Sequence, residues 1–241
     1  MIIASAQTSP TRGNTEANIQ EHYELIELAS KKNADLIVFP EMSLTGYERE
    51  KARELAFTTE DSRLKRLRQL SCEKQITIIA GAPIVIKNDL FIGAFILSPN
   101  NSISIYTKQF LHGGENNYFK SSFKYDPIIE LKGERISCAI CADISNPEHV
   151  RNAKKKGASL YISGIFFTPN GISNAYNVLS NYAKKHSMNV LMSNYGGESW
   201  GLESGGMSSF WDKQGTLITK IDNTSSGLLL VEKKNDLWVK R

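Results

Sequence analysis

Three polar residues stand where short apolar runs end, at Glu41, Lys108 and Cys141. Each of these runs is typical of a buried strand, and in α/β sheets the strand ends are where sites are built. A thiol needs a base to become a good nucleophile, a carboxylate in a dry pocket can serve as that base, and an ammonium can stabilise a developing oxyanion. The three residue types therefore suit nucleophilic catalysis by a cysteine.

Cys141 lies between an expected strand and an expected helix. Asn146 can cap that helix, Pro147 fits its first position, and Glu148 suits the positive end of its dipole. Backbone N–H groups are unpaired at such a start, which favours a thiolate or an oxyanion nearby. A free cysteine is also among the most buried residue types, so a buried spectator is the alternative interpretation of Cys141 taken alone.

Cys138 and Cys141 form a C-x-x-C motif, which raises redox chemistry as an alternative. Both cysteines fall in a strand-like run over residues 134–142. Residues three apart on a strand point to opposite faces, so a disulfide between them would be strained. A zinc site is less favoured, because no second Cys/His pair at ligand spacing is present. We interpret Cys138 as a core residue and expect no metal and no organic cofactor.

The composition is that of a mildly basic globular protein of 241 residues with a net charge of +4. Lys154, Lys155 and Lys156 form its densest basic cluster, and they suit the solvent-exposed end of a helix. We therefore expect no nucleic-acid partner. The chain has no signal-like start and no apolar run of membrane-spanning length, so no membrane partner is expected. Its three cysteines do not suggest a secreted disulfide framework, which favours a cytoplasmic location.

Apolar runs and helical periodicity alternate along the chain. Strands are expected at residues 2–6, 35–40, 76–83, 90–97, 103–107, 128–131, 134–142, 159–163, 189–193, 207–211, 217–221 and 227–232. Helices are expected at residues 14–32, around 64–70, at 147–156 and at 173–186. This pattern predicts an α/β protein with mixed sheets, two sheets packed together and helices outside. No linker interrupts it, so residues 1–241 are expected to form a single domain.

Two loops rich in small polar residues, at 109–126 and 195–206, interrupt the pattern, and a long loop inside a compact domain is often functional. Residues near strand ends or in the first loop are candidate substrate contacts, with plain packing as the alternative. They are Tyr47, His112, Tyr118, Phe166 and Phe167. His112 is also compatible with a solvated loop position, and we interpret His149 as a helix-surface residue.

Several short segments, taken in order, resemble the nitrilase or carbon–nitrogen hydrolase superfamily over nearly the whole chain. These segments are ADLIVFPE at 34–41, LTGY at 44–47, YTK at 106–108, GE at 114–115, ICAD at 140–143, PE at 147–148, Asn194 and GMS at 206–208. The resemblance implies a four-layer α-β-β-α sandwich with two mixed sheets. It also implies a homodimer or a higher homo-oligomer, in which the dimer forms through the helix that follows the nucleophile.

The same resemblance implies a role for each matching residue. Cys141 corresponds to the nucleophile, Glu41 to the general base and Lys108 to the catalytic lysine. Glu115 matches a second glutamate that helps to position the substrate and the lysine. The backbone N–H of Ala142 would join Lys108 in stabilising the oxyanion.

The implied reaction is hydrolysis of a small-molecule amide to a carboxylic acid and ammonia through a thioester on Cys141. Asp143 resembles the amidase branches of the superfamily, where nitrilases tend to carry Glu. An N-carbamoyl amine hydrolase or a nitrilase on the same site is the alternative within this chemistry. A non-catalytic protein that binds a small molecule on this fold is the alternative of another class.

Overall fold

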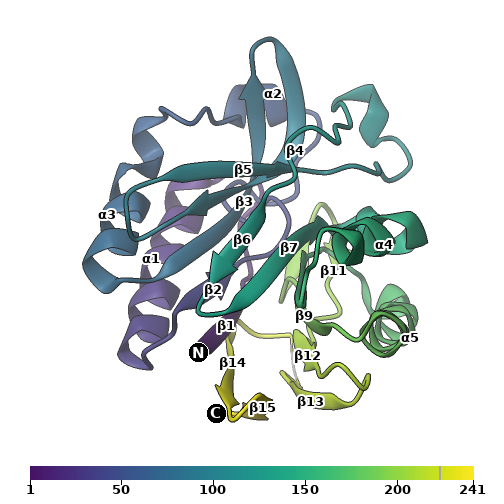
Figure 1. The fold of residues 1–241 in the computed structure, drawn as a ribbon. Coiled ribbons are helices and arrows are strands. Elements are labelled where there is room, and N and C mark those ends of the chain that lie inside the picture. The colour runs from purple at the N-terminus through teal and green to yellow at the C-terminus, as the bar shows by residue number, and fades with distance from the viewer. Residues whose placement is uncertain (223) are drawn as a thin grey trace.

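Two β-sheets pack face to face and are covered by helices on their outer sides, as the computed structural model of residues 1–222 and 224–241 shows (Figure 1). Helices α1 (Thr15–Lys31) and α3 (Lys65–Lys74) cover one sheet, and α4 (Pro147–Lys155) and α5 (Pro169–His186) cover the other. The architecture is therefore the expected four-layer α-β-β-α sandwich with two mixed sheets.

The first sheet has seven strands in the order β15-β14-β1-β2-β3-β4-β5. Their bounds are β1 (Ile2–Gln7), β2 (Leu36–Val38), β3 (Thr77–Ile86), β4 (Asp89–Leu97), β5 (Ile103–Thr107), β14 (Gly227–Lys234) and β15 (Leu237–Lys240). The central strands β1, β2 and β3 are parallel, and the outer strands pair antiparallel.

The second sheet repeats this arrangement with six strands in the order β13-β12-β9-β8-β7-β6. Their bounds are β6 (Ile128–Leu131), β7 (Glu134–Ile140), β8 (Leu160–Gly164), β9 (Asn189–Ser193), β12 (Ser209–Trp211) and β13 (Leu217–Lys220). Strands β7, β8 and β9 are parallel, and the others pair antiparallel. The carboxyl ends of parallel strands share one edge, where polar side chains from different strands meet.

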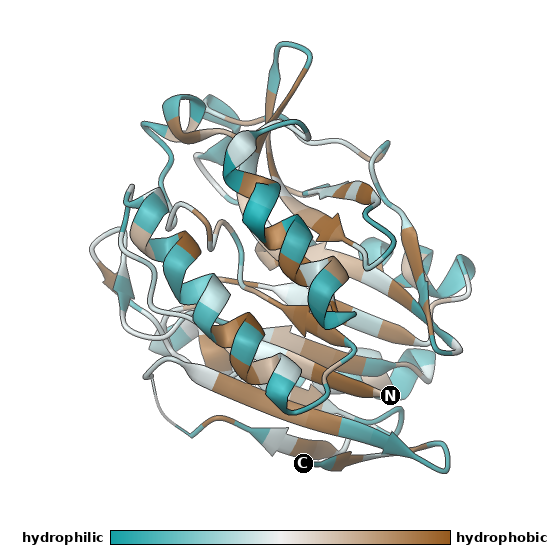
Figure 2. Ribbon diagram, turned by 90° about the vertical axis from the view of Figure 1, so that its left-hand side faces the viewer, coloured by the Kyte–Doolittle hydropathy of each residue, from teal (hydrophilic) through white to brown (hydrophobic). Residues whose placement is uncertain are grey.

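Amphipathic helices hold the outer layers in place. Figure 2 shows α1 and α3 with hydrophilic residues outward and the hydrophobic strands behind them. Ile26 of α1, Leu67 of α3 and Phe95 of β4 are fully buried members of one apolar cluster. A second cluster fills the space between the sheets and continues beneath α4 and α5, with Val38, Ile162 and Leu179 among its members. Burial of these apolar faces is the main stabilising term of such a layered fold.

The structure corrects several expected boundaries. The strand expected at 134–142 ends at Ile140, where a single 3₁₀ turn over Cys141–Ser145 begins. Helix α5 starts at Pro169 rather than Ser173. The last strand is β15, which pairs with β14 beyond the expected final strand at 227–232.

Several short elements lie outside the sequence expectations. They are α2 (Ala52–Leu55), the 3₁₀ turns Ser62–Leu64 and Glu115–Asn117, and the hairpin of β10 (Glu198–Ser199) with β11 (Leu202–Glu203). Elements this short carry no readable periodicity, because one turn or one strand pair contains too few side chains. In the part of the chain that the structure describes, no helix is long and apolar enough to cross a membrane.

Candidate active site

A buried ammonium lies between two buried carboxylates at the edge where the two sheets meet. Lys108 Nζ is 2.7 Å from Glu41 Oε1 and 2.8 Å from Glu115 Oε1. Glu41 is 1 % exposed, and Lys108 and Glu115 are fully buried. Buried charges are stable only when they are paired and hydrogen-bonded. The expected grouping of these three residues is therefore present in the tertiary structure.

Close backbone packing positions Glu41. The chain turns sharply after β2, and Met42 has a positive φ of 49°. A Cβ atom at Gly81 of β3 would lie 2.3 Å from the Pro40 carbonyl oxygen, and one at Gly164 of β8 would lie 2.8 Å from the Phe39 carbonyl oxygen. Only glycine permits this approach from both sheets. The turn that carries Glu41 is thus packed tightly between a strand of each sheet.

Cys141 follows β7 directly and occupies a left-handed conformation with φ of 42°. Such a φ is uncommon for a residue other than glycine, and it turns the side chain out of the strand at a functional site. The thiol is 7 % exposed, and its Sγ lies 3.9 Å from the Phe166 carbonyl oxygen. Cys138 lies inside β7, is 2 % exposed, and like Cys141 is a free thiol. The prediction that Cys138 is a core residue is confirmed.

Burial and neighbouring charges set the protonation of this group. Burial raises the pKa of Glu41 to about 7, and the ammonium of Lys108 opposes that rise. Burial alone would lower the pKa of Lys108, but the Glu41 carboxylate holds it above its usual range. Burial, followed by the charge of Glu41, raises the pKa of the Cys141 thiol well above its usual value. At neutral pH the cysteine is therefore a thiol that needs a base.

One oxygen of Glu41 is available to act as that base. Oε1 accepts the hydrogen bond from Lys108, whereas the buried Oε2 has no hydrogen-bond partner among the described residues. Besides burial, the charge of Glu41 raises the pKa of the Cys141 thiol, so the thiol lies close enough to this carboxylate to be affected by it. An unsatisfied buried carboxylate oxygen is costly and is typical of a site that awaits a proton.

Asp143 joins the turn of Cys141 to the strand of Lys108. Its Oδ1 accepts the backbone N–H groups of Gln109 and Phe110, and its Oδ2 accepts the N–H of Ile140 and the hydroxyl of Tyr106. The sequence analysis used Asp143 only for the choice of substrate class. Its position two residues after the nucleophile was the available signal for a positioning role.

The wall next to Glu115 is built from two residues of one loop. Tyr47 donates its hydroxyl hydrogen to Glu115 Oε1 at 2.7 Å, and the Arg49 guanidinium donates two hydrogen bonds to the same hydroxyl. Trp200, from the tip of the β10–β11 hairpin, lies over the guanidinium at 4.4 Å. Tyr47 was an expected site residue, whereas Arg49 and Trp200 were missed because nothing in their local sequence marks them.

Of the remaining candidate substrate contacts, some lie near Cys141 and Tyr47, and the others lie on the protein surface. Phe166 packs its ring against Tyr47 at 5.4 Å, and Ala142 lies in the turn beside the nucleophile. Phe167 is half-buried, and its backbone N–H donates to Asn194 Oδ1. His112 is exposed, and Tyr118 is 41 % exposed, which places their side chains on the surface of the loop.

His149 is not a helix-surface residue. It is 2 % exposed, and its ring nitrogens lie 2.7 Å from the Tyr106 hydroxyl and 2.8 Å from the Tyr161 hydroxyl. The expectation failed because helix α4 turns this position inward, where the two tyrosines satisfy the imidazole. Burial lowers the pKa of His149, so the ring is neutral at pH 7.

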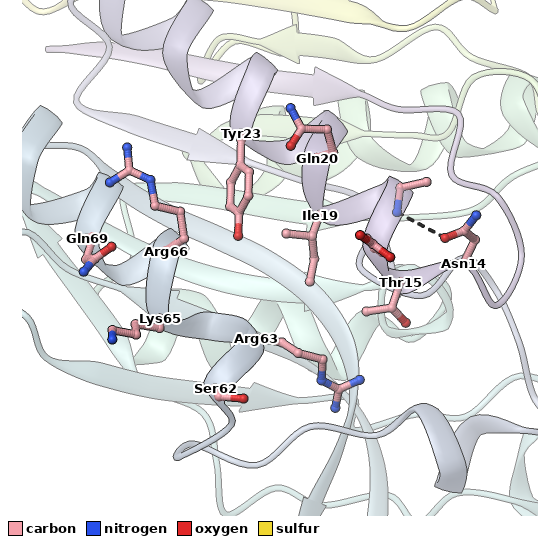
Figure 3. A pocket seen from close by; sticks show the side chains of 12 residues that line it. Asn14, Thr15, Ile19, Gln20, Tyr23, Ser62, Arg63, Lys65, Arg66 and Gln69 are labelled. Carbon is pink, nitrogen blue, oxygen red and sulfur yellow. Dashed lines mark hydrogen bonds between the residues drawn. The ribbon is translucent and has the colours of Figure 1, made fainter.

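A groove of about 940 Å³ lies elsewhere, between α1 and α3 (Figure 3). Tyr23 of α1, Arg66 of α3 and Arg63 of the 3₁₀ turn before α3 are among its lining residues. Arg63 is paired with Asp61, and Arg66 is paired with Glu73. The groove is not lined by the four candidate catalytic residues, which are Glu41, Lys108, Glu115 and Cys141. It is therefore separate from the candidate active site.

The fold and the cysteine, glutamate and lysine group together define a class of hydrolase that acts on carbon–nitrogen bonds. The family model for carbon-nitrogen hydrolases matches residues 2–238, and the chain belongs to that family. The 2-oxoglutaramate amidase of Bacillus subtilis is 32 % identical over 165 residues, which cover 67 % of this chain and 63 % of that protein. Family membership over nearly the whole chain places the protein among the carbon-nitrogen hydrolases.

Two further proteins extend the comparison. The glutamine-dependent NAD(+) synthetase of Thermotoga maritima is 28 % identical over 151 residues, which are 60 % of this chain but only 26 % of that enzyme. The structure of the amidase NitN from Nesterenkonia sp. AN1 superposes with a TM-score of 0.88 at 23 % identity, covering 98 % of this chain and 94 % of that chain. This likeness establishes a shared fold.

Proposed function

We propose that the protein hydrolyses a small-molecule amide to a carboxylic acid and ammonia, with Cys141 as nucleophile. The observation that carries this proposal is the ammonium of Lys108 held between Glu41 and Glu115. Glu41 Oε2 has no hydrogen-bond partner among the described residues, and the Glu41 charge acts on the Cys141 thiol. A structural ion pair would not need an unsatisfied carboxylate oxygen next to a cysteine in a strained turn.

In the first half of the proposed reaction, Cys141 Sγ attacks the amide carbonyl carbon and Glu41 takes the thiol proton. Lys108 and the backbone N–H of Ala142 stabilise the negative oxygen of the tetrahedral intermediate. Glu41 then gives its proton to the leaving nitrogen. The carbon–nitrogen bond breaks, ammonia departs, and a thioester remains on Cys141.

In the second half, Glu41 removes a proton from a water molecule as that water attacks the thioester carbonyl. The same oxyanion donors stabilise the second tetrahedral intermediate, which collapses with loss of the Cys141 sulfur. The proton returns to the sulfur, and the carboxylic acid leaves. Glu115 holds Lys108 in place throughout by its hydrogen bond to the ammonium.

An amide is preferred as substrate because the carbon–nitrogen hydrolases to which the chain is similar include proteins named as amidases. A variant of the Nesterenkonia amidase, 22 % identical to this chain, is described in complex with butyramide. N-carbamoyl amines and nitriles require the same nucleophile and base, so they belong in any substrate screen.

The proposal is tested by ammonia release from a panel of aliphatic amides, ω-amides, N-carbamoyl amines and nitriles. Wild type and Cys141→Ala are compared, and intact mass is recorded at early times. Cysteine-dependent ammonia release with an acyl adduct on Cys141 would support the proposal. A Cys141 that fails to react even with iodoacetamide, together with no turnover of any compound, would instead favour the non-catalytic binding protein.

We further propose that residues 1–241 act as one domain, as a cytoplasmic homodimer. The three free cysteines support this location, because disulfides are rare in the cytoplasm. Support for the dimer is the family resemblance, which points to helix α4 after the nucleophile. Light scattering on the purified protein tests the dimer, and a monomer at micromolar concentration would contradict it.

A further inference from the structure

Arg49 is a buried cation whose hydrogen-bond acceptors are all uncharged. It is 8 % exposed, and it donates from Nε and Nη2 to the Tyr47 hydroxyl and from Nη1 to the Gly113 carbonyl oxygen. No carboxylate is among its hydrogen-bond partners in the described part of the chain. Burying a guanidinium without an anion costs several kcal/mol, so such an arrangement calls for a functional reason.

The guanidinium retains donors for a ligand. A guanidinium has five N–H groups, and the three hydrogen bonds leave N–H groups on both Nη1 and Nη2 without a protein acceptor among the described residues. Trp200 covers the flat face of the guanidinium at 4.4 Å. A guanidinium stacked in this way offers its edge, which matches a carboxylate in two parallel hydrogen bonds.

The surrounding loop is shaped to hold this cation. A Cβ atom at Gly114 would lie 3.1 Å from Arg49 Nη1, and Gly114 has a positive φ of 84°. A side chain at this position would therefore press against the guanidinium and would also strain the backbone. The glycine leaves room for the guanidinium next to Glu115, which is the adjacent residue in the chain.

Arg49 also lies on the same wall as the reacting groups. Tyr47 links them, because its hydroxyl contacts both Arg49 and Glu115 and its ring packs 5.4 Å from Phe166. The carbonyl oxygen of Phe166 is in turn 3.9 Å from Cys141 Sγ. A small molecule whose amide carbon meets Cys141 would therefore extend along Tyr47 toward the guanidinium.

We infer that Arg49 binds an anionic group on the acyl part of the substrate, so that the substrate is an amide that also carries a carboxylate. This inference rests on the proposed amidase function and names its substrate class. Lys108 does not serve this purpose, because both neighbouring carboxylates already contact its ammonium. Arg49 thus determines which substrates bind, and it takes no part in the chemical steps at Cys141.

The test compares two substrate classes of similar length. Succinamate and glutaramate carry a carboxylate, whereas butyramide and valeramide do not. Arg49→Gln is expected to raise KM for the carboxylate-bearing amides by about 30-fold or more, since a buried charge pair loses one partner. For the neutral amides the rise in KM is expected to be much smaller, because no charge pair is lost there, so the difference between the two substrate classes is the test. Arg49→Lys should restore part of the loss.

Two variants separate recognition from positioning. Tyr47→Phe removes the hydroxyl that contacts Glu115 and should lower kcat for both substrate classes alike. Arg68→Gln is the matched control, because Arg68 is a half-buried arginine of α3 whose partner is Asn101 and not a residue of the site. Arg49→Gln could instead lower kcat equally for both substrate classes and leave the ratio of KM between carboxylate-bearing and neutral amides unchanged. That result would mean that Arg49 only holds Tyr47, and it would overturn the inference.

Binding to an inactive protein distinguishes failure of this inference from failure of the amidase function. Glutaramate is titrated calorimetrically into Cys141→Ala and into Cys141→Ala with Arg49→Gln. Affinity that is lost in the double variant supports the anion site even if the wild type releases no ammonia. Equal affinity in both proteins overturns the anion site, even if the wild type hydrolyses neutral amides.

Discussion

Asp143 Oδ1 accepts the backbone N–H of Phe110 at 2.8 Å, and this hydrogen bond ties the turn of the nucleophile to the strand of the lysine. The two segments come from different sheets, since Cys141 follows β7 and Lys108 follows β5. A carboxylate that bonds both segments fixes the distance between the thiol and the ammonium. Such fixed geometry is what allows charge stabilisation without reorganisation during the reaction.

Asp143→Asn is expected to lower kcat by about 100-fold with little change in KM, because a misplaced reacting group loses rate rather than binding. The amide offers one acceptor oxygen in place of two, so at least one buried donor is left unpaired and the free energy of unfolding falls by about 2 kcal/mol. Steady-state kinetics and urea unfolding measure the two effects. Asp212→Asn is the control, since Asp212 accepts backbone N–H groups in a turn away from the site. A drop in kcat of equal size in that control would refute the positioning role.

Cys141→Ala should reduce ammonia release by at least about 10⁴-fold while leaving the unfolding transition intact, because removal of a nucleophile abolishes the covalent path. Cys138→Ser changes a thiol that lies inside β7 and serves as the comparison. Its activity per folded molecule should remain close to that of wild type. Iodoacetamide labelling followed by peptide mass spectrometry should locate the modification on Cys141. Labelling that favours Cys138 would contradict the assignment.

Activity is expected to fall as the pH drops through about 7. Glu41 must be ionised to accept the thiol proton, and burial raises its pKa to about 7. Below that pH, kcat/KM should lose about tenfold per pH unit, and above it the rate should reach a plateau because Lys108 keeps its proton. Glu41→Gln should remove this acid limb and lower kcat/KM by about 10³-fold. An unchanged acid limb in Glu41→Gln would show that another group controls it.

Lys108→Met should destabilise the fold as well as abolish activity. The change leaves Glu41 and Glu115 buried with no cation between them, and breaking a buried ion pair costs about 3–5 kcal/mol in the free energy of unfolding. Lys120→Met is the matched control, because its exposed pair with Asp89 contributes less than about 1 kcal/mol. Urea unfolding at pH 8 measures both variants. Equal stability of the two would mean that the carboxylates tolerate each other without the ammonium.

His22 is expected to make stability depend on pH. It is fully buried, its Nε2 lies 2.9 Å from the Ser43 hydroxyl, and burial lowers its pKa to about 4. Since the folded-state pKa lies below the unfolded value, this contribution is present above pH 6.5 and is lost as the pH falls toward 4. Between pH 7.5 and pH 5 the loss should be about 2 kcal/mol in the free energy of unfolding. His22→Gln should flatten this part of the curve, whereas His112→Gln, at an exposed position, should not.

The sequence alone was sufficient for the layered fold. It also named Glu41, Lys108, Glu115 and Cys141 as candidate site residues, and the structure brings Lys108 into contact with both glutamates. Apolar runs and helical periodicity are local properties, and they place each polar residue at the end of its strand. Three strands, Ile103–Thr107, Ile128–Leu131 and Asn189–Ser193, were predicted with their observed boundaries. The family motifs then added a proposed role for each residue, because the motifs can be recognised in the sequence by their residues and their order.

Only the tertiary structure decided which side chains complete the site. Arg49 and Trp200 meet across 151 positions of the chain, and Asp143 reaches the loop after Lys108 from the other sheet. His149 was expected on a helix surface, yet two tyrosines enclose it. These contacts depend on how the sheets stack, and no local pattern encodes a partner from a distant strand. The sequence therefore determined the layered fold and the proposed reacting groups, whereas packing between the layers determined their environment and the residues proposed to select a substrate.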